Sequence, residues 1–375
     1  MSEAVGSGRS REAFIEDLRA NNYTTYFVAT HPKYAKGKGA FRFTSTPISA
    51  ADPCHWRHAQ TRRRLFELSG ILSTEEAERR NINFVNPGLK DFMPAATLPT
   101  LRGGIQMLLP GEKACTHRHS ANAFRTVLEA PDEGAYTVVE GTRIPMHPGD
   151  LVLTPNWTWH DHHNEGDSHA IWYDGLDVLM AYWLGGVFFQ EYEEVSGQAY
   201  LPVQRGAQAL RHAFGPGMVN RDAMLPEHIP SSDNSLLYYP YHKARNLLQA
   251  LSEAGSGNPR DGVMLEYVNP VTGGPAFPSM SNGLRLIGAG TSLEAWHRTE
   301  NIIFITLEGS VTFTLPHGVR YATELHDVVA IPSWVPYGID NGGRDPAVIF
   351  SQSDRPLFEK LGFYREQRAT QVPPG

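Results

Sequence analysis

The chain contains two copies of one strand-rich segment. Residues 103–189 and 283–350 both consist of short runs rich in Val, Thr, Tyr and Trp, separated by turn-forming residues. Such runs predict short β-strands. The sequences GDLVLTPNW at 149–157 and HDVVAIPSW at 326–334 show that the two strand-rich segments resemble each other. Two long copies exclude a solenoid, so the sequence predicts a duplicated all-β unit.

Helical patterns lie outside these two segments. Capping residues and apolar spacing predict helices at 10–22, from Ser73 onward, at 207–214 and at 243–254. The predicted organisation is an N-terminal helical and mixed extension (1–95), a first β unit (96–190), a linker (191–260), a second β unit (261–355) and a C-terminal tail (356–375).

Composition excludes several classes of protein. Acidic residues outnumber basic ones by 40 to 33 in the 375 residues, which argues against a general nucleic-acid binder. Cys54 and Cys115 are the only cysteines, so there is no disulfide framework. The N-terminus lacks the apolar core of a signal peptide, and the longest apolar run, 176–189, is interrupted by Asp177 and two glycines. We expect a reduced, cytoplasmic protein without a membrane segment.

Three histidines of the first copy have the spacing of metal ligands. His117 and His119 are two residues apart, so on a β-strand they point to the same side. His160 lies about forty residues later, on a segment that can pair with the first strand in a barrel. Together they predict a three-histidine metal site with open positions. Imidazole suits iron, zinc, copper and nickel alike, so the ligands alone do not name the metal.

The second copy lacks these ligands. Aligning the two copies places Trp296, Arg298 and Tyr337 where His117, His119 and His160 stand in the first. The nearby His297 is one residue out of register and is expected to face the other way. We therefore predict no metal in the second unit, and a structural or subunit-contact role for it.

The histidine spacing resembles the two cupin motifs. This resemblance implies a mainly β bicupin fold, with two double-stranded β-helix (jelly-roll) barrels plus N-terminal and linker helices. Two departures stand out. No carboxylate follows the His-x-His pair, and Trp157 occupies the position after the motif's proline that is usually Gly.

A longer set of motifs resembles the gentisate/salicylate 1,2-dioxygenase family over nearly the whole chain. The motifs are NPGL (86–89), GIQ (104–106), HRHSANAFR (117–125), MHPGD (146–150), TPNWTWHDHHN (154–164) and WYDGLD (172–177). The resemblance implies one non-haem Fe(II) per chain and O2 as co-substrate. The expected substrate is a small aromatic 2-hydroxycarboxylate, cleaved between its carboxyl-bearing and hydroxyl-bearing carbons. The resemblance also implies a homotetramer, with 179–189 and the N-terminal helices as contact surfaces.

Four residues are the candidate catalytic set around the metal. Arg125 has the strand parity of the histidine pair, so it is expected to point into the barrel and hold the substrate carboxylate. His162 shares the face of His160 and could bond the substrate hydroxyl or move a proton. Gln106 could orient a substrate oxygen, and Asp174 could hold either His162 or Arg125 in place.

Further substrate contacts are expected at Gly104, at Trp172 and at Arg80, with Arg79 as the alternative to Arg80. Arg102 stands two residues before Gly104, where this family usually has an aromatic residue. We hypothesise that Arg102 meets an electron-withdrawing or anionic ring substituent, as in 5-nitrosalicylate.

Other functions remain open from the sequence. Within the ring-cleaving class, gentisate, salicylate, 5-substituted salicylates and 1-hydroxy-2-naphthoate compete as substrates. A zinc cupin isomerase or hydrolase also uses three histidines and a water. A non-enzymatic ligand-binding cupin is the third alternative, against which the open metal site and inward Arg125 and His162 argue.

Overall fold

The computed structural model forms two compact units, 1–50 and 51–375. The described residues are 10–31, 33–34, 43–74, 76–77, 80–91, 93, 95–203, 214–215, 218–219, 237–270 and 272–369. The smaller unit contains α1 (Arg11–Ala20), which begins at the cap Ser10, and α2 (Tyr26–Thr30), which begins at the cap Thr25. Each cap side chain accepts a backbone N–H three residues later at 3.2 Å, as expected for helix N-termini. The helix predicted at 10–22 is thereby confirmed.

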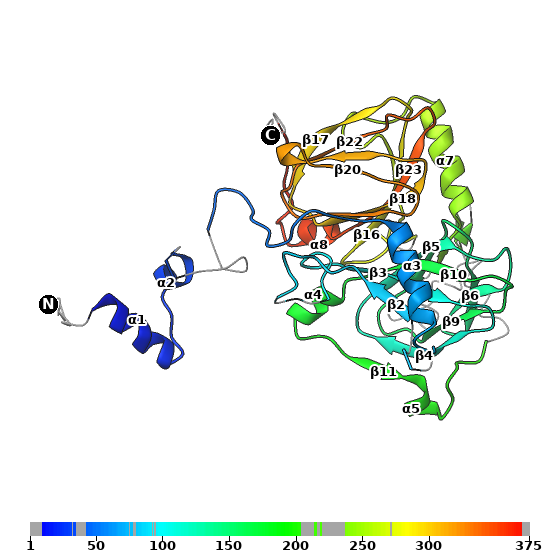
Figure 1. Ribbon diagram of the computed structural model, residues 1–375, viewed down its shortest axis with the longest axis horizontal. Helices are drawn as coiled ribbons and strands as arrows, with labels where there is room; N and C mark the ends of the chain where they lie inside the picture. Colours follow the sequence, from blue (N-terminus) through cyan, green and yellow to red (C-terminus); the bar gives the residue numbers. More distant parts are fainter. Residues whose placement is uncertain are drawn as a thin grey trace. The chain divides into compact units, whose positions relative to one another are not determined.

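The larger unit consists of two β-barrels, each made of a six-stranded and a five-stranded antiparallel sheet (Figure 1). The six-stranded sheet of the first barrel has the order β14 (Tyr238–Tyr239), β8 (Leu151–Thr154), β5 (Ala123–Glu129), β10 (Ala170–Leu176), β3 (Arg102–Leu108), β2 (Arg80–Asn83). Its five-stranded sheet has the order β11 (Phe189–Glu191), β4 (Lys113–His119), β9 (His160–Asn164), β6 (Ala135–Val139), β7 (Thr142–Pro145).

The second barrel repeats this arrangement. Its six-stranded sheet has the order β1 (Cys54–Trp56), β21 (Val328–Ile331), β18 (Ile302–Glu308), β23 (Ala347–Ser353), β16 (Ser281–Ile287), β15 (Val263–Glu266). Its five-stranded sheet has the order β20 (Arg320–Ala322), β19 (Thr312–Thr314), β22 (Tyr337–Asp340), β17 (Ser292–Arg298), β24 (Glu366–Arg368). The predicted mainly β, two-barrel architecture is confirmed.

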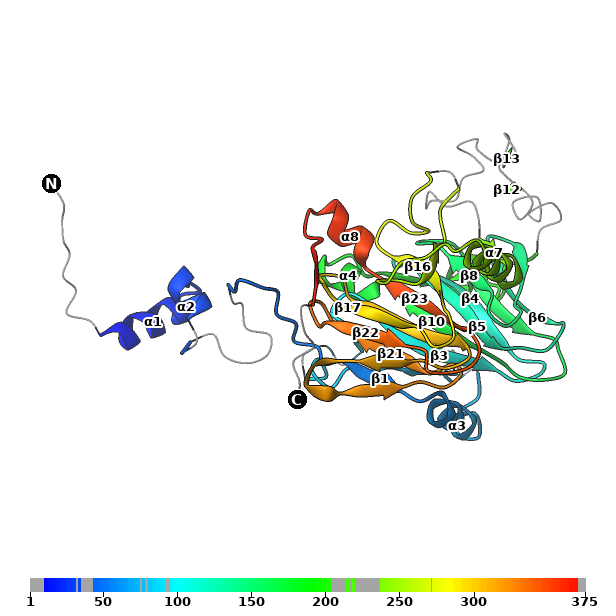
Figure 2. The same ribbon diagram turned by 90° about the horizontal axis from the view of Figure 1, so that it is seen from above.

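The two barrels exchange edge strands. β1 precedes the first barrel in sequence but pairs with β21 of the second, while β14 precedes the second barrel and pairs with β8 of the first. Each exchanged strand leads directly into a helix, α3 (His58–Ser69) after β1 and α7 (Tyr241–Glu253) after β14. Figure 2 shows α3 and α7 on opposite sides of the paired barrels. The exchange ties the two barrels into one unit.

The six-stranded sheets meet at the junction of the barrels, so their central strands are covered on both faces. All seven residues of β10 are buried. Trp172 packs in the core of the first barrel, whereas the hydroxyl of its neighbour Tyr173 donates to Gln352 Oε1 on β23 at 2.6 Å. A strand buried on both faces is expected to be largely apolar, and in 170–176 Asp174 is the one charged residue.

A pair of matched aspartates cross-links the barrels. Asp177 accepts from Asn122 of its own barrel at 2.8 and 2.9 Å and from Ser279, which precedes β16 of the other barrel. Asp354 accepts from Asn301 at 2.7 and 2.8 Å and from Thr100, which precedes β3, at 2.5 Å. Burial raises the pKa of both carboxyls, that of Asp354 to about 7.

Connecting helices are α4 (Val178–Trp183), α5 (Tyr192–Ser196), a 3-10 turn η3 (Pro316–Gly318) and α8 (Arg355–Lys360), and a small ladder joins β12 (Phe214–Gly215) to β13 (Met218–Val219). The helix predicted at 243–254 is observed as α7. The helix predicted at 207–214 lies outside the described residues except for Phe214, which is in β12. No helix in the described part of the chain has the length and apolarity needed to cross a bilayer.

The structure corrects the prediction of a helix from Ser73 onward. Ser73 and Glu76 form the expected capping box, with Glu76 N donating to Ser73 Oγ at 3.2 Å and Ser73 N donating to Glu76 Oε2 at 3.1 Å. The described residues after Ser73 nevertheless form only a turn before β2 begins at Arg80. A capping box therefore stabilises one turn here without a helix behind it.

Candidate functional site

The three predicted ligands lie on two paired strands of the first barrel. His117 and His119 come from β4, and His117 is directly opposite His160 on β9. A bulge between Ala114 and His117 shifts the register, so that Ala114 pairs with His162. His160 and His162 are two residues apart on β9 and share one inner face. The ligand nitrogens of the three histidines all lie within 4.8 Å of one another. The structure thus brings together the three residues that the spacing predicted.

Backbone carbonyls set the tautomer of all three rings. The Nδ1 atoms of His117, His119 and His160 bond to the carbonyls of Cys115, Ala121 and Thr158 at 3.0, 2.9 and 2.9 Å. A carbonyl only accepts, so each Nδ1 carries the proton and each Nε2 carries a lone pair. His160 Nε2 is buried without a hydrogen-bond partner among the described residues.

The electrostatics of this cluster also fit a cation. Burial, with His117, Arg125 and His119 nearby, lowers the pKa of His160 well below its usual range. The imidazole is therefore neutral at pH 7 and available as a ligand. Three neutral, carbonyl-oriented imidazoles with converging Nε2 atoms suit a divalent transition metal.

Trp157 adopts the left-handed backbone conformation that explains why glycine is usual at its position. Its φ is 60°, and the matching Trp334 of the second barrel has φ 65°. The N–H of Trp157 donates to the carbonyl of His119 at 2.8 Å, and the guanidinium of Arg118 lies 4.1 Å from the Trp157 ring centroid. The cation–π contact and the hydrogen bond hold this strained turn against the ligand His119.

Arg125 lies inside the barrel, fully buried, in a network with Asp174. Arg125 Nε is 3.5 Å from Asp174 Oδ1, and Arg125 Nη1 donates to Thr154 Oγ1. Gln106 Nε2 donates to Asp174 Oδ2 at 3.0 Å. Asp174 therefore holds Arg125 and Gln106, which decides between the two partners considered for it from the sequence.

His162 is held by a different residue, one that the sequence did not single out. Its Nδ1 is 2.8 Å from the hydroxyl of Thr137 on β6, and its ring is 5.2 Å from that of Trp172. The ring of His160 is 6.1 Å away. Thr137 is directly opposite His162 in the ladder, so strand parity would have found it if the β6–β9 pairing had been known.

Arg102 and Gly104 share the inner face of β3 with Gln106. Arg102 is half-buried and donates to Asn83 Oδ1 on β2 at 2.5 Å. A side chain at Gly104 would lie 2.8 Å from the carbonyl oxygen of Ile82, so the close approach of β2 requires glycine there. Asn83 is a second polar residue of this face that the sequence did not reveal.

Arg80 is a correction to the predicted substrate set. Arg80 pairs with Met107 in the ladder, so it lies on the sheet face opposite to that of Gln106. It is 1 % exposed and forms an ion pair with Glu112. Its buried charge is thus compensated on the other side of the sheet, and Arg80 leaves the candidate site. Arg79 lies outside the described residues.

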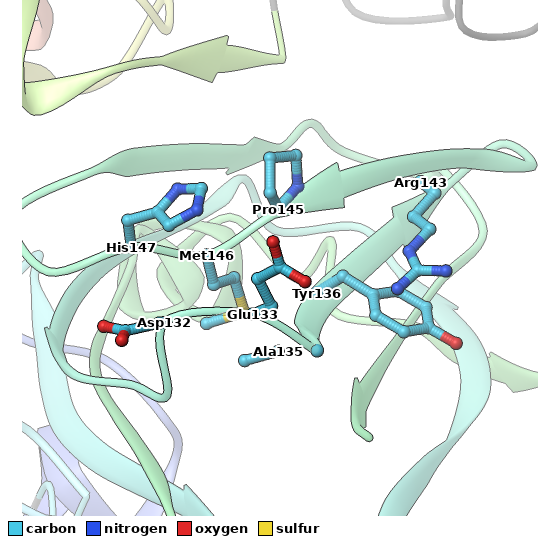
Figure 3. A pocket seen from close by; sticks show the side chains of 9 residues that line it. Asp132, Glu133, Ala135, Tyr136, Arg143, Pro145, Met146 and His147 are labelled. Atoms are coloured by element: carbon cyan, nitrogen blue, oxygen red, sulfur yellow. The ribbon is translucent and has the colours of Figure 1, made fainter. Parts of the chain in front are cut away.

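One surface pocket lies away from the three histidines. Its volume is about 220 Å³, and the turn before β6 together with β7 lines it (Figure 3). The guanidinium of Arg143 lies over the Tyr136 ring, 3.8 Å from its centroid, as Figure 3 shows. None of the predicted site residues lines this pocket.

The second barrel has the same positions filled differently. Arg298 Nη1 donates to the hydroxyl of Tyr337 at 2.5 Å and its Nη2 donates to Asp261 at 2.7 Å. His297 faces away and bonds to the carbonyl of Trp334 at 2.8 Å. Phe304 and Phe313 fill the interior together with the other core residues. The absence of a metal from this barrel remains a prediction.

The fold and the histidine cluster define a bicupin protein with a candidate metal centre in its first barrel. A cupin domain family, Cupin_2, matches residues 104–179. Gentisate 1,2 dioxygenase 1 of Aquipseudomonas alcaligenes is 34 % identical over 328 residues, covering 87 % of this chain and 89 % of the relative. The 5-aminosalicylate 1,2-dioxygenase of a Comamonas species is 30 % identical over 364 residues, covering 95 % and 90 %.

Solved structures agree with these relatives. Salicylate 1,2-dioxygenase from Pseudoaminobacter salicylatoxidans, solved as adducts with gentisate, superposes with a TM-score of 0.80 at 26 % identity and covers 99 % of this chain and 98 % of that one. The chain belongs to the gentisate/salicylate 1,2-dioxygenase family, as the motifs in 86–177 predicted.

Proposed function

We propose that this chain is an Fe(II)-dependent dioxygenase that opens the ring of a 2-hydroxybenzoate with O2, between the carboxyl-bearing and hydroxyl-bearing carbons. The proposed substrates are gentisate, salicylate or a 5-substituted salicylate such as 5-nitrosalicylate. One observation carries the proposal. Three imidazoles converge through Nε2 in the same barrel as Arg125, a fully buried arginine that can bind a carboxylate.

Iron is the proposed metal, held by His117, His119 and His160. Bound Fe(II) supplies the ability to bind O2 and the two substrate oxygens together and to pass electron density between them. Hydrogen bonds from Nδ1 to backbone carbonyls hold the three rings in place. These bonds reduce the reorganisation needed on metal binding.

Arg125 is the proposed binding residue for the substrate carboxylate. Its guanidinium is already oriented by Asp174 and Thr154, so little side-chain entropy is lost when substrate binds. The charges of Arg125 and Asp174 nearly cancel. A bound substrate carboxylate therefore adds one negative charge to the site, which the charge-assisted hydrogen bond from Arg125 and the charge of the proposed divalent metal would offset.

His162, Gln106 and Trp172 are the proposed partners of the other substrate oxygens. The hydroxyl of Thr137 bonds His162 Nδ1, so Nε2 can bond the substrate hydroxyl or move its proton. Gln106 Oε1 and Trp172 Nε1 are buried without hydrogen-bond partners among the described residues. An acceptor and a donor of this kind orient a bound hydroxyl and carboxylate.

Arg102 is the proposed specificity residue, with Gly104 leaving room beside it. Its position on the inner face of β3 supports contact with a ring substituent. Arg102 retains four donor hydrogens when one bonds Asn83, enough to meet a nitro group or a carboxylate.

We also propose a cytoplasmic homotetramer that acts in aromatic catabolism. The family resemblance supports the oligomer, and an exposed apolar segment from α4 to β11 supports a contact surface there. Its exposed members are Tyr182, Trp183, Leu184, Val187, Phe188 and Phe189. Cys54 and Cys115 are not joined by a disulfide, which suits a reducing compartment. Light scattering of the full chain tests the oligomer, and a monomer would contradict it.

The experiment for the activity is anaerobic loading of the purified full chain with Fe(II), followed by O2-uptake assays over a panel of substrates. The panel contains gentisate, salicylate, 5-aminosalicylate, 5-nitrosalicylate and 1-hydroxy-2-naphthoate. We expect uptake with at least one member and none when Zn²⁺ replaces iron. No uptake with any member would overturn the proposal, and equal turnover with Zn²⁺ would overturn the role of iron.

A further inference from the structure

A second histidine-rich cluster lies at the junction of the two barrels, outside the site described above. His58 is the first residue of α3, Glu129 ends β5 of the first barrel, and His326 lies in the turn before β21 of the second. Their ligand atoms all lie within 4.8 Å of one another, the same limit that the three histidines of the first barrel meet. Three separate parts of the chain therefore converge on one point.

The carboxylate of Glu129 is held in a fixed orientation. Arg62 Nε, one turn along α3 from His58, donates to its two oxygens at 2.8 and 3.0 Å. His169 Nε2 lies 2.7 Å from Oε2, and His58 Nε2 lies 2.9 Å from Oε1. Arg62 and His169 thus orient the carboxylate, while Oε1 faces His58. The His58 side chain is 9 % exposed and that of Glu129 is 23 % exposed, so the cluster is largely shielded from water.

His326 is in a strained backbone conformation. Its φ is 65°, in the left-handed region where a β-carbon is unfavourable. Its ring lies across that of His58, with centroids 5.0 Å apart and planes at 87°. Backbone strain at a non-glycine residue is retained where the side chain has a task.

The internal duplication shows what the fold needs at this place. In the other half of the molecule, Gly149 has the position of His326, with φ 86°, and Tyr241 begins α7 as His58 begins α3. Glu308 accepts from the hydroxyl of Tyr241 at 2.7 Å and from Arg245 Nε at 2.8 Å, as Glu129 does from His58 and Arg62. An arginine and one hydrogen-bonding side chain therefore suffice to tether the helix.

The comparison isolates His326 as the additional side chain and shows that His58 replaces a tyrosine. A side chain at Gly149 would collide with the Tyr241 ring, so that copy has no room for a histidine there. The copy with His326 has two nitrogen donors and one carboxylate around a common point. Two histidines and one carboxylate form a ligand set for Zn²⁺, Fe²⁺ and related ions.

We propose that His58, Glu129 and His326 form a second metal site, for a divalent transition-metal ion such as Zn²⁺. The ion would join α3, the first barrel and the second barrel through one ligand from each. Metal binding at Nε2 of a neutral His58 requires the tautomer with the proton on Nδ1, so the proton between His58 Nε2 and Glu129 Oε1 is exchanged through solvent to Nδ1 of the same ring. Arg62 and His169 remain bonded to the carboxylate and keep it oriented. The role is structural, because the site lies outside the candidate catalytic barrel interior.

Metal counting on the chelator-treated full chain tests the site, with Co²⁺ as the probe. We expect two ions per wild-type chain, one at the catalytic histidines and one at the junction. His326→Gly places the residue of the other copy at the same φ, so it is expected to fold and to bind one ion. His160→Ala is also expected to bind one, and the combined variant none.

A matched control is available in the same chain. His317 is exposed and also has a positive φ, 61°, so His317→Gly relieves the same kind of strain without touching the cluster. We expect His317→Gly to retain two ions. One ion per wild-type chain, or two in His326→Gly, would overturn the proposal.

A second readout is independent of ring cleavage. In the His160→Ala background, Zn²⁺ is expected to raise the melting temperature, since it binds only the folded chain, and His326→Gly is expected to abolish that shift. An equal Zn²⁺ shift with and without His326 would overturn the proposal. Failure of the O2-uptake assay would leave these outcomes unaffected, so the two proposals fail separately.

Discussion

The inner face of β9 in the first barrel carries His160 and His162, whereas the matching strand of the second barrel, β22, carries Tyr337 and Ile339. The two strands have equivalent partners. β4 bulges before His117 and β17 bulges before Trp296, and each of these residues is opposite the first residue of its neighbour. The backbone framework of the candidate metal centre is thus present twice, but the three histidines are present once.

The residues around the three histidines also differ between the two barrels. The first barrel has a polar network at these positions, and the second has a mostly apolar core. By sheet position Arg125, Asp174, His162, Trp172 and Gln106 correspond to Phe304, Ser351, Ile339, Ile349 and Arg285. Two of these five are polar, Ser351 and Arg285. Arg285 lies against the Phe304 ring at 5.2 Å and pairs with Asp261 at 3.4 Å.

The difference lies in what fills each interior. Both barrels contain buried polar atoms without hydrogen-bond partners among the described residues, such as Gln106 Oε1 and Trp172 Nε1 in the first and Asn282 Nδ2 and Trp296 Nε1 in the second. The second barrel has a packed aromatic and aliphatic interior, and it exchanges an edge strand with the first. We infer that the second barrel supports the first, whose interior is committed to binding.

The largest expected effect is the difference between two variants, one that removes His160 from the first barrel and one that changes its counterpart Tyr337 in the second. Hydrogen-bond partners of metal ligands are typically worth 10- to 100-fold, so His160→Ala should reduce O2 uptake by more than about 100-fold and remove the iron of the first barrel. Tyr337→Phe in the second barrel should change kcat less than about threefold, because no metal is expected there. Steady-state O2 uptake with iron analysis measures both. Similar losses in the two variants would break the comparison.

A smaller effect is expected from the carboxylate-binding arginine. Arg125→Lys keeps the charge but loses the planar fork, so kcat/KM should fall about 10- to 100-fold, mainly through KM. A substrate amide in place of the carboxylate should lose the same factor in wild type and little more in the variant. Steady-state kinetics with salicylate and salicylamide test this. An unchanged KM in Arg125→Lys would assign the arginine to structure alone.

The matched aspartates at the junction predict a pH dependence of stability. The pKa of Asp354 is about 7 in the folded chain, against an ordinary value of 3.8. The folded state therefore binds the proton more tightly. This contribution to the free energy of unfolding is full below pH 3.8 and is lost as the pH rises toward about 7.

Chemical denaturation between pH 4 and 8 measures this slope. Asp354→Asn removes the titrating group, so its stability should fall less over this range than that of wild type. Asp177→Asn, in the other half of the junction, should flatten the curve in the same direction, since burial raises that pKa as well. Identical slopes in wild type and Asp354→Asn would show that Asp354 titrates normally.

The smallest expected effect concerns substrate choice. Arg102→Trp should lower the ratio of kcat/KM for 5-nitrosalicylate over salicylate severalfold, because a surface-type ionic contact is worth about 1 kcal/mol or less. Arg102→Lys, which keeps the charge, should change the ratio less. In the second barrel the corresponding residue is Ser281, at the start of β16, which supports treating Arg102 as particular to the binding barrel. Unchanged ratios in Arg102→Trp would refute the hypothesis.

Much of the candidate site could be predicted without the structure because it depends on short spacings. His117 and His119 share a face because side chains alternate along a strand, and the duplication revealed which positions of the second copy had lost their ligands. Arg125 followed from the same parity. The helix after Ser73 and the sheet face of Arg80 were predicted wrongly, because a local pattern does not say how far a helix continues or which sheet face is inside.

The sequence alone was enough to predict the duplicated β architecture, the convergence of three histidines and the family. Tertiary structure alone decided the exchange of edge strands, the Gln106–Asp174–Arg125 network and the meeting of His58 with Glu129 and His326. These contacts join residues tens to hundreds of positions apart. Their existence depends on the order and register of strands in the sheets, and a single sequence states strand pattern but not strand order.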